Sequence, residues 1–272
     1  MGERIVTRRR VVTALCLLLA ALVLPVGVAG YLTFIRSPDN APSEVCGAPT
    51  DRPAVVAAGA SITQGSLGAN WVDALQDRPE YAGFRLVNAG INGNTSADLR
   101  DRLHTDVVAC RPAAVMILVG TNDVRDEVPV TEYEANLATI IDRLREHTTA
   151  RIALMSLPPL GENLDSELNR RLAGYNAAIE DLATRTDVDH LPVHERMAEL
   201  LGQRADRPGY AFSFPLALTA ATRHYVLGQS WDAIARSGGR ELLIDHIHLS
   251  DRGASVITEL AASWPATADP PF

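Results

Sequence analysis

Two short segments far apart in the chain carry residue types that could act together on an ester. Residues 59–65, Gly-Ala-Ser-Ile-Thr-Gln-Gly, place Ser61 on a small, flexible turn directly after an apolar run. Residues 245–248, Asp-His-Ile-His, hold a carboxylate and an imidazole three positions apart. A serine hydroxyl becomes a nucleophile when an imidazole takes its proton and a carboxylate orients that imidazole. We therefore predict acyl transfer by Ser61, His248 and Asp245, although each segment alone also fits a helix cap or a packed loop histidine.

Two further turns offer hydrogen-bond donors for the oxyanion of a tetrahedral intermediate. Each follows an apolar run with the character of a strand: residues 88–95 follow the run 84–87, and residues 120–123 follow the run 113–119. A glycine N–H and an asparagine amide are suitable donors, and the candidates are Gly90 and Asn122. Either residue alone is also common in turns, because Gly and Asn tolerate left-handed backbone angles.

Ser61, Gly90, Asn122 and His248 resemble, in order and local context, the four sequence blocks that define the SGNH hydrolases, also called the GDSL family. The resemblance implies that Ser61 is the nucleophile and also an oxyanion donor through its N–H. It further implies that Gly90 and Asn122 complete the oxyanion hole and that Asp245 supports His248. One departure is Ala60, which stands where the family usually has Asp, and this change puts the rigidity of the turn in doubt more than its chemistry.

The rest of the chain alternates between strand-like and helix-like segments, as a doubly wound α/β fold requires. Short crossovers between them imply right-handed βαβ units and a parallel sheet with all four blocks at its carboxyl edge. The resemblance implies the same three-layer, flavodoxin-like architecture for residues 53–266, with a short tail at 267–272. The expected helices cover residues 69–76, 96–108, 131–147 and 166–184, and the later strands cover residues 152–157 and 188–193.

The N-terminus predicts a membrane anchor. The basic tail, residues 1–10, contains four arginines, and the stretch 11–35 has no charged residue. As a helix this stretch would be roughly 37 Å long, enough to cross a hydrocarbon core of about 30 Å. The positive-inside rule then places everything after it outside the cytoplasm. A cleaved signal peptide is the alternative, since 28–30 is a stretch of small residues; both alternatives predict an exported catalytic domain.

Residues 36–52 are rich in Pro, Asp, Asn and Ser and are interpreted as a short extended tether. The tether contains Cys46, which precedes the first expected strand, as Cys110 precedes a later one. Both cysteines should therefore lie at the amino edge of the sheet, where a disulfide could join them outside the cytoplasm. Two unrelated buried thiols are the alternative.

The segment between residues 202 and 240 supplies candidates for an apolar substrate pocket, because it immediately precedes the Asp245–His248 loop. Four aromatic residues in it could form the wall, or could simply pack the segment against the domain. These residues are Phe212, Phe214, Tyr225 and Trp231.

Composition excludes several other classes of function. The chain has 272 residues and a net charge of −8, without the basic stripe that nucleic acids require. The histidines show no metal-binding motif, and His246 and His248 should point to opposite faces of an extended segment. We therefore expect no metal, no cofactor and no nucleic-acid partner.

The predicted function is extracytoplasmic hydrolysis of a small carboxylic ester, from a lipid, a lysophospholipid or an acetylated sugar. The alternatives are an acyltransferase acting on envelope glycans and a catalytically silent binding relative.

Overall fold

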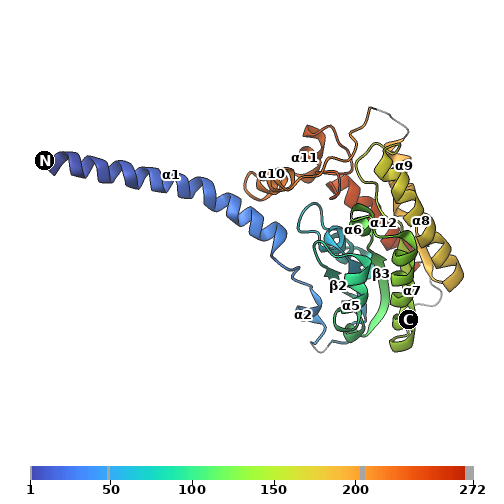
Figure 1. Cartoon of the computed structure of the whole chain (residues 1–272). Helices are drawn as coiled ribbons and strands as arrows, with labels where there is room; N and C mark the ends of the chain where they lie inside the picture. The colour runs from blue at the N-terminus through green and yellow to red at the C-terminus, as the bar shows by residue number, and fades with distance from the viewer. Residues whose placement is uncertain (1, 48–49, 203–205, 267–272) are drawn as a thin grey trace.

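A computed structural model describes residues 2–47, 50–202 and 206–266. Its centre is a five-stranded parallel sheet in the order β2-β1-β3-β4-β5, covered by helices on both faces (Figure 1). The strands are β1 (Ala54–Gly59), β2 (Arg85–Gly90), β3 (Pro112–Leu118), β4 (Arg151–Met155) and β5 (Asp189–Leu191). This architecture confirms the predicted three-layer, doubly wound fold.

The strands are apolar because helices bury both faces of the sheet. Every residue of β1 is buried, and so is every residue of β2 after Arg85. One group of mutually packed helices covers one face: α5 (Ser96–Asp106), α7 (Val130–His147) and α8 (Glu167–Thr186). Helices α4 (Trp71–Gln76), α9 (Val193–Leu201) and α12 (Asp251–Ala266) form the other group. The remaining helices of the domain are α2 (Pro42–Val45), α3 (Ser61–Gln64), α6 (Thr121–Arg125), α10 (Phe214–Tyr225) and α11 (Trp231–Ser237), with single 3₁₀ turns at Pro79–Tyr81 and Val108–Cys110.

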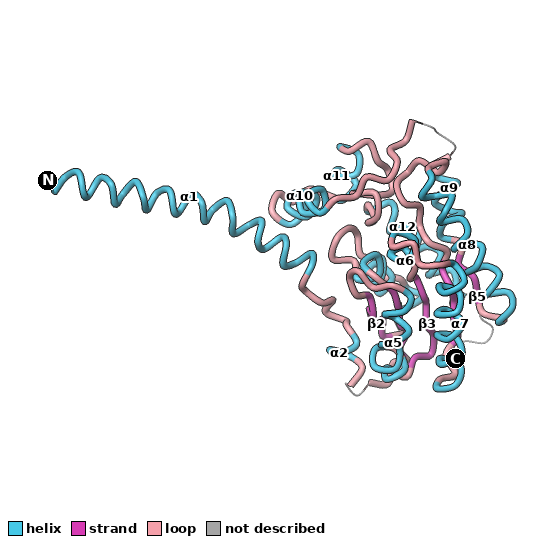
Figure 2. The backbone as a smooth tube through the Cα atoms, viewed as in Figure 1, coloured by secondary structure: helices cyan, strands magenta, loops and turns pink. Residues whose placement is uncertain are grey.

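Helix α1 (Gly2–Phe34) projects away from the domain (Figure 2). Within the described residues, its section Val12–Phe34 is one helix that is long and apolar enough to cross a membrane. The end of α1 contacts the α/β domain, where it packs against α10.

The segment between α1 and β1 is not the extended tether that composition suggested. It contains α2 and runs alongside the edge strand β2. There the Asn88 N–H of β2 donates to the Asn40 carbonyl of this segment over 3.0 Å. Arg85 also donates to the carbonyl of Val45. An edge strand has unpaired backbone groups, and this segment satisfies some of them.

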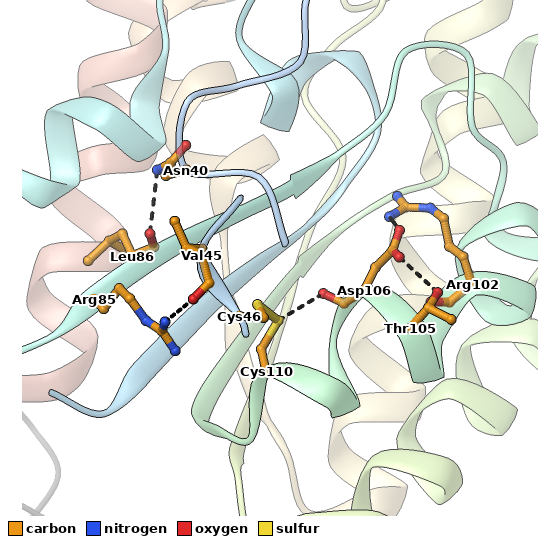
Figure 3. Close-up of a disulfide and its surroundings, with 9 residues drawn as sticks. All are labelled: Asn40, Val45, Cys46, Arg85, Leu86, Arg102, Thr105, Asp106 and Cys110. Carbon is orange, nitrogen blue, oxygen red and sulfur yellow. Dashed lines mark hydrogen bonds and ion pairs between the residues drawn. A yellow bond between two sulfur atoms is a disulfide. The ribbon is translucent and has the colours of Figure 1, made fainter. Parts of the chain in front are cut away.

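Cys46 and Cys110 form a disulfide with a Cα–Cα distance of 4.6 Å (Figure 3). The bond joins the segment before β1 to the residues before β3, at the amino edge of the sheet. It therefore lies at the edge opposite to Ser61, which follows the carboxyl end of β1.

Candidate active site

The structure brings Ser61, His248 and Asp245 together in one hydrogen-bonded chain. The Ser61 Oγ lies 2.9 Å from His248 Nε2, and His248 Nδ1 lies 2.8 Å from Asp245 Oδ2. Ser61 begins α3 at the end of β1, and the other two residues lie on the loop before α12. Because the imidazole contacts the hydroxyl with one nitrogen and the carboxylate with the other, the geometry fits a serine nucleophile with its base.

Asp245 is fully buried and its second oxygen also has partners. Its Oδ1 accepts the N–H groups of Ile247 and His248 over 3.1 and 2.8 Å. Burial alone would raise the pKa of Asp245, but the charge of His248 and these hydrogen bonds hold the pKa below its ordinary value. Asp245 is therefore a carboxylate at neutral pH and can stabilise a protonated imidazole.

A second buried carboxylate, Glu162, holds the loop that carries His248. Its Oε1 accepts the N–H groups of Leu242 and Leu243 over 2.6 and 3.0 Å, and Arg207 pairs with its Oε2 over 3.1 Å. The Gly161 N–H also donates to the His246 carbonyl over 2.8 Å. These bonds fix a loop that has no regular secondary structure beyond one isolated bridge, and no local sequence motif pointed to Glu162.

Asn122 lies on the other side of the nucleophile, on α6 after β3. Its Oδ1 accepts from Arg125 Nη1 over 3.0 Å, and its Nδ2 donates to the Asn94 carbonyl over 2.8 Å. An amide nitrogen carries two hydrogens, so one remains for a ligand. Arg125 thus fixes which side of the amide faces the cavity; it lies three residues after Asn122 on the same helix, and that spacing could have identified it.

Gly90 does not belong to the site, and this corrects the sequence-based assignment. Its N–H donates to Asn88 Oδ1 over 3.0 Å, and a Cβ on it would lie 2.2 Å from the Gln64 backbone nitrogen. Gly90 is therefore a packing position against α3, with its donor already used. The glycine that lines the cavity is Gly93, in the following turn, whose φ of +79° favours glycine.

Two polar side chains, from Arg102 and Asp123, hold the loops around this turn. Arg102 Nη2 donates to the carbonyls of Gly59 and Ala89, each over 2.9 Å, and so joins the ends of β1 and β2. Asp123 accepts the Ser96 N–H over 2.9 Å and thereby ties α6 to the start of α5. Burial raises the pKa of Asp123. The Gly93 turn is thus held from both of its ends.

A cavity of about 120 Å³ opens beside Ser61. Phe212 and Phe214 line it, as predicted, and the Phe212 ring centroid lies 6.2 Å from that of His248. Tyr225 and Trp231 do not: they line a separate cavity of about 260 Å³, and their assignment to the Ser61 pocket was wrong. The two rings point elsewhere because they pack with His224, which stacks on Trp231. The complete lining of the Ser61 cavity is Phe34, Ser61, Leu67, Asn92, Gly93, Asn122, Arg125, Phe212, Phe214, Ile247 and His248.

Comparison with known proteins identifies the class to which this fold and site belong. The model of the GDSL-like lipase/acylhydrolase family matches residues 57–256. The chain therefore belongs to this family of ester hydrolases, which confirms the predicted membership.

Two named enzymes are similar in sequence over part of their length. An acetylxylan esterase of Geobacillus stearothermophilus is 31% identical over 137 residues, which cover 45% of this chain and 62% of that enzyme. Esterase TesA of Pseudomonas aeruginosa is 34% identical over 116 residues, which cover 42% of this chain and 58% of that enzyme. The chain thus spans about three fifths of the length of these relatives.

Solved structures agree on the fold. The acetylxylan esterase Axe2 of Geobacillus stearothermophilus superposes with a TM-score of 0.57 at 22% identity, over 78% of this chain and 93% of that one. The acetyl xylan esterase AlAXEase gives a TM-score of 0.57 at 21% identity, over 79% and 100% of the two chains. At these identities the likeness shows the architecture alone.

Proposed function

We propose that this protein is a membrane-anchored serine esterase that hydrolyses short-chain carboxylic esters outside the cytoplasm. The observation that carries the proposal is the hydrogen-bonded chain from Ser61 through His248 to Asp245, with distances of 2.9 and 2.8 Å. A catalytically silent relative would have no need to keep this chain aligned beside an apolar cavity.

The chemistry follows from the positions of these groups. Ser61 Oγ attacks the ester carbonyl while His248 Nε2 takes its proton, and the same proton then passes to the departing alcohol as the acyl C–O bond breaks. Water, deprotonated by His248, releases the acyl group and regenerates Ser61. The Ser61 N–H, the Gly93 N–H and the second hydrogen of Asn122 Nδ2 are the proposed oxyanion donors. Ser61 is the first residue of α3, so its N–H has no acceptor within that helix.

Cavity size favours a short acyl group. A volume of about 120 Å³ is well below the several hundred Å³ of pockets that enclose drug-sized ligands. The lining is mostly apolar, with Leu67, Phe212 and Ile247 beside the catalytic pair. An acetyl group or one slightly longer fits this space, in keeping with the acetylxylan esterases among the relatives.

An extracytoplasmic location is supported by three observations. Four arginines precede the apolar helix, a charge distribution that retains the preceding tail in the cytoplasm. A disulfide joins Cys46 to Cys110, and such bonds persist in oxidising compartments. A protein described as an uncharacterised lipoprotein, YqeF of Bacillus subtilis, is 32% identical over 123 residues. We propose that α1 remains attached as a single-pass anchor, since its last residues pack against the catalytic domain.

The test is hydrolysis of p-nitrophenyl esters of increasing chain length by the full chain. We expect turnover of the acetate to exceed that of the octanoate and to vanish in Ser61→Ala. Ser255→Ala, which changes an exposed serine on α12, is the matched control and should leave turnover unchanged. Absence of turnover in the folded wild-type protein would contradict the proposal and direct the search to acyl transfer onto sugar acceptors.

A further inference from the structure

The N-terminal helix contributes directly to the wall of the Ser61 cavity. Phe34, the last residue of α1, lines the cavity, and its ring centroid lies 6.2 Å from that of Phe214 at the start of α10. One wall of the cavity thus comes from the helix that we propose to cross the membrane. The cavity and the end of the membrane span lie at the same place in the molecule.

Hydrogen bonds fix the end of α1 to the turn that carries the nucleophile. The Thr33 carbonyl accepts from Ser66 Oγ over 2.6 Å and from Asn92 Nδ2 over 3.0 Å. The Arg36 carbonyl accepts from Gln64 Nε2 over 3.2 Å. Gln64 and Ser66 follow Ser61 within five residues. The segment after α1 is also hydrogen-bonded along β2. Together these bonds fix the position of the apolar helix α1 relative to Ser61.

The contact between α1 and α10 is close-packed. Ala29 and Thr33 of α1 have no exposed surface, and α10 buries Ala217, Ala220 and Ala221. Small residues such as these allow two helices to approach closely. Helix α10 therefore lies beside the outer end of the membrane span, as Figures 1 and 2 show.

Exposed apolar side chains of the catalytic domain gather at this place. Among the described residues after Ile35, the large apolar side chains that remain exposed are all on α10 or directly after it, except Ile91 in the loop after β2. The most exposed are Phe214 at 70% and Leu227 at 63%. Large apolar side chains that gather on one exposed element of a domain can mark an interaction site. The exposed apolar residues on α10 and directly after it are Phe214, Tyr225, Val226 and Leu227.

We propose that α10 rests in the outer surface of the bilayer and that the Ser61 cavity takes its ester from the membrane. The substrate class is then a short-chain ester of an amphiphile. The short acyl group enters the cavity between Phe34 and Phe214, while the apolar body of the alcohol stays in the bilayer. This inference rests on the proposed esterase function and adds the source of the substrate to it. A bilayer is the favoured partner because the exposed apolar residues of α10 lie beside α1, the helix that we propose to cross the membrane.

Activity in vesicles tests the source of the substrate. The full chain is reconstituted into vesicles of ether-linked phosphatidylcholine, a lipid without ester bonds, and is given hexadecyl acetate in the bilayer or p-nitrophenyl acetate in the water. The test variant is Leu227→Glu, whose side chain lies outside the Ser61 cavity. Thr149→Glu is the matched control, with the same charge placed on an exposed residue before β4, at the opposite edge of the sheet.

We expect Leu227→Glu to lower hydrolysis of hexadecyl acetate about tenfold, the factor that corresponds to keeping one leucine-sized side chain out of an apolar layer. Hydrolysis of p-nitrophenyl acetate should stay at the wild-type rate, which also shows that the variant is folded. Thr149→Glu should change neither rate. An unchanged ratio of the two rates in Leu227→Glu would overturn the proposal.

A second measurement does not depend on catalysis. A fluorescent label on Leu227→Cys, in a Cys16→Ser background, should be quenched by nitroxide-bearing lipids, whereas the same label on Thr149→Cys should not. Equal quenching at the two positions would overturn the bilayer contact even in an active enzyme. Loss of p-nitrophenyl acetate hydrolysis in the wild-type protein would instead contradict the esterase function, while the quenching result would still decide where α10 lies.

Discussion

Removal of the Cys46–Cys110 disulfide should destabilise the catalytic domain and leave its chemistry intact. The two cysteines are 64 positions apart, and they close a long loop that includes β1 and β2. In the chain-entropy model a loop of this length restricts the unfolded chain by about 4 kcal/mol. For a domain of this size, each kcal/mol corresponds to about 2 to 4 °C in Tm, so the expected decrease is roughly 8 to 16 °C.

The substitution to make is Cys46→Ala with Cys110→Ala, because alanine leaves no unpaired hydroxyl at the buried Cys110 position. Unfolding of the full chain in guanidinium, followed by circular dichroism, gives the change in free energy. Cys16→Ala is the control, since it removes a cysteine that closes no loop. The rate of p-nitrophenyl acetate hydrolysis at 20 °C should not change, because the disulfide and Ser61 lie at opposite edges of the sheet. A loss of stability below 1 kcal/mol, or a fall in turnover while the protein is folded, would refute this reasoning.

Two further predictions concern the catalytic groups. Asn122→Ala removes a proposed oxyanion donor and should lower kcat about 100- to 1,000-fold; undiminished turnover would exclude that role. Asp245→Asn removes the acceptor that orients His248 and should lower kcat about 10⁴-fold. The folded pKa of Asp245 lies below its ordinary value of 3.8. The carboxylate therefore contributes stability above that pH and loses it as the pH falls through the folded pKa. The wild type should have a larger free energy of unfolding than Asp245→Asn, and this difference should be larger at pH 7 than at pH 3. An equal difference at the two pH values would contradict the lowered pKa of Asp245.

The sheet and most of its helices were predictable because their signals are local. The expected strands fall on strands of the sheet, and the helix-like segments 131–147 and 166–184 fall on α7 and α8. The end of β2 was not predictable in this way. Asn88, Ala89 and Gly90 have the composition of a turn, yet they pair with Ala57, Ala58 and Gly59 of β1. Pairing between strands decides where β2 ends, and the glycine that lines the cavity is therefore Gly93 in the following turn and not Gly90.

The cavity was predictable only in part, because its walls come from segments that meet in the tertiary structure alone. Phe212 and Phe214 precede the His248 loop and were found by that proximity. Tyr225 and Trp231 also precede the His248 loop. They lie at the end of α10 and the start of α11, however, and they line a different cavity. Phe34 had no signal in its own segment, since an apolar residue at the end of an apolar helix is expected of any membrane anchor. The docking of α1 on α10 turns it into a residue of the cavity.

Ala60 illustrates how a missing side chain at an active site can be replaced by one from another strand. The family usually has an aspartate before the serine, and its loss raised the question of what holds the turn. The Ala60 carbonyl accepts from the N–H groups of Thr63 and Gln64, and Asn88 Nδ2 donates to the Thr63 carbonyl over 2.8 Å. The other end of that amide accepts the Gly90 N–H. Asn88, buried at the end of β2, therefore holds α3 and the strand end together. The rigidity of the nucleophile turn comes from β2, so the absence of the aspartate is no argument against catalysis by Ser61.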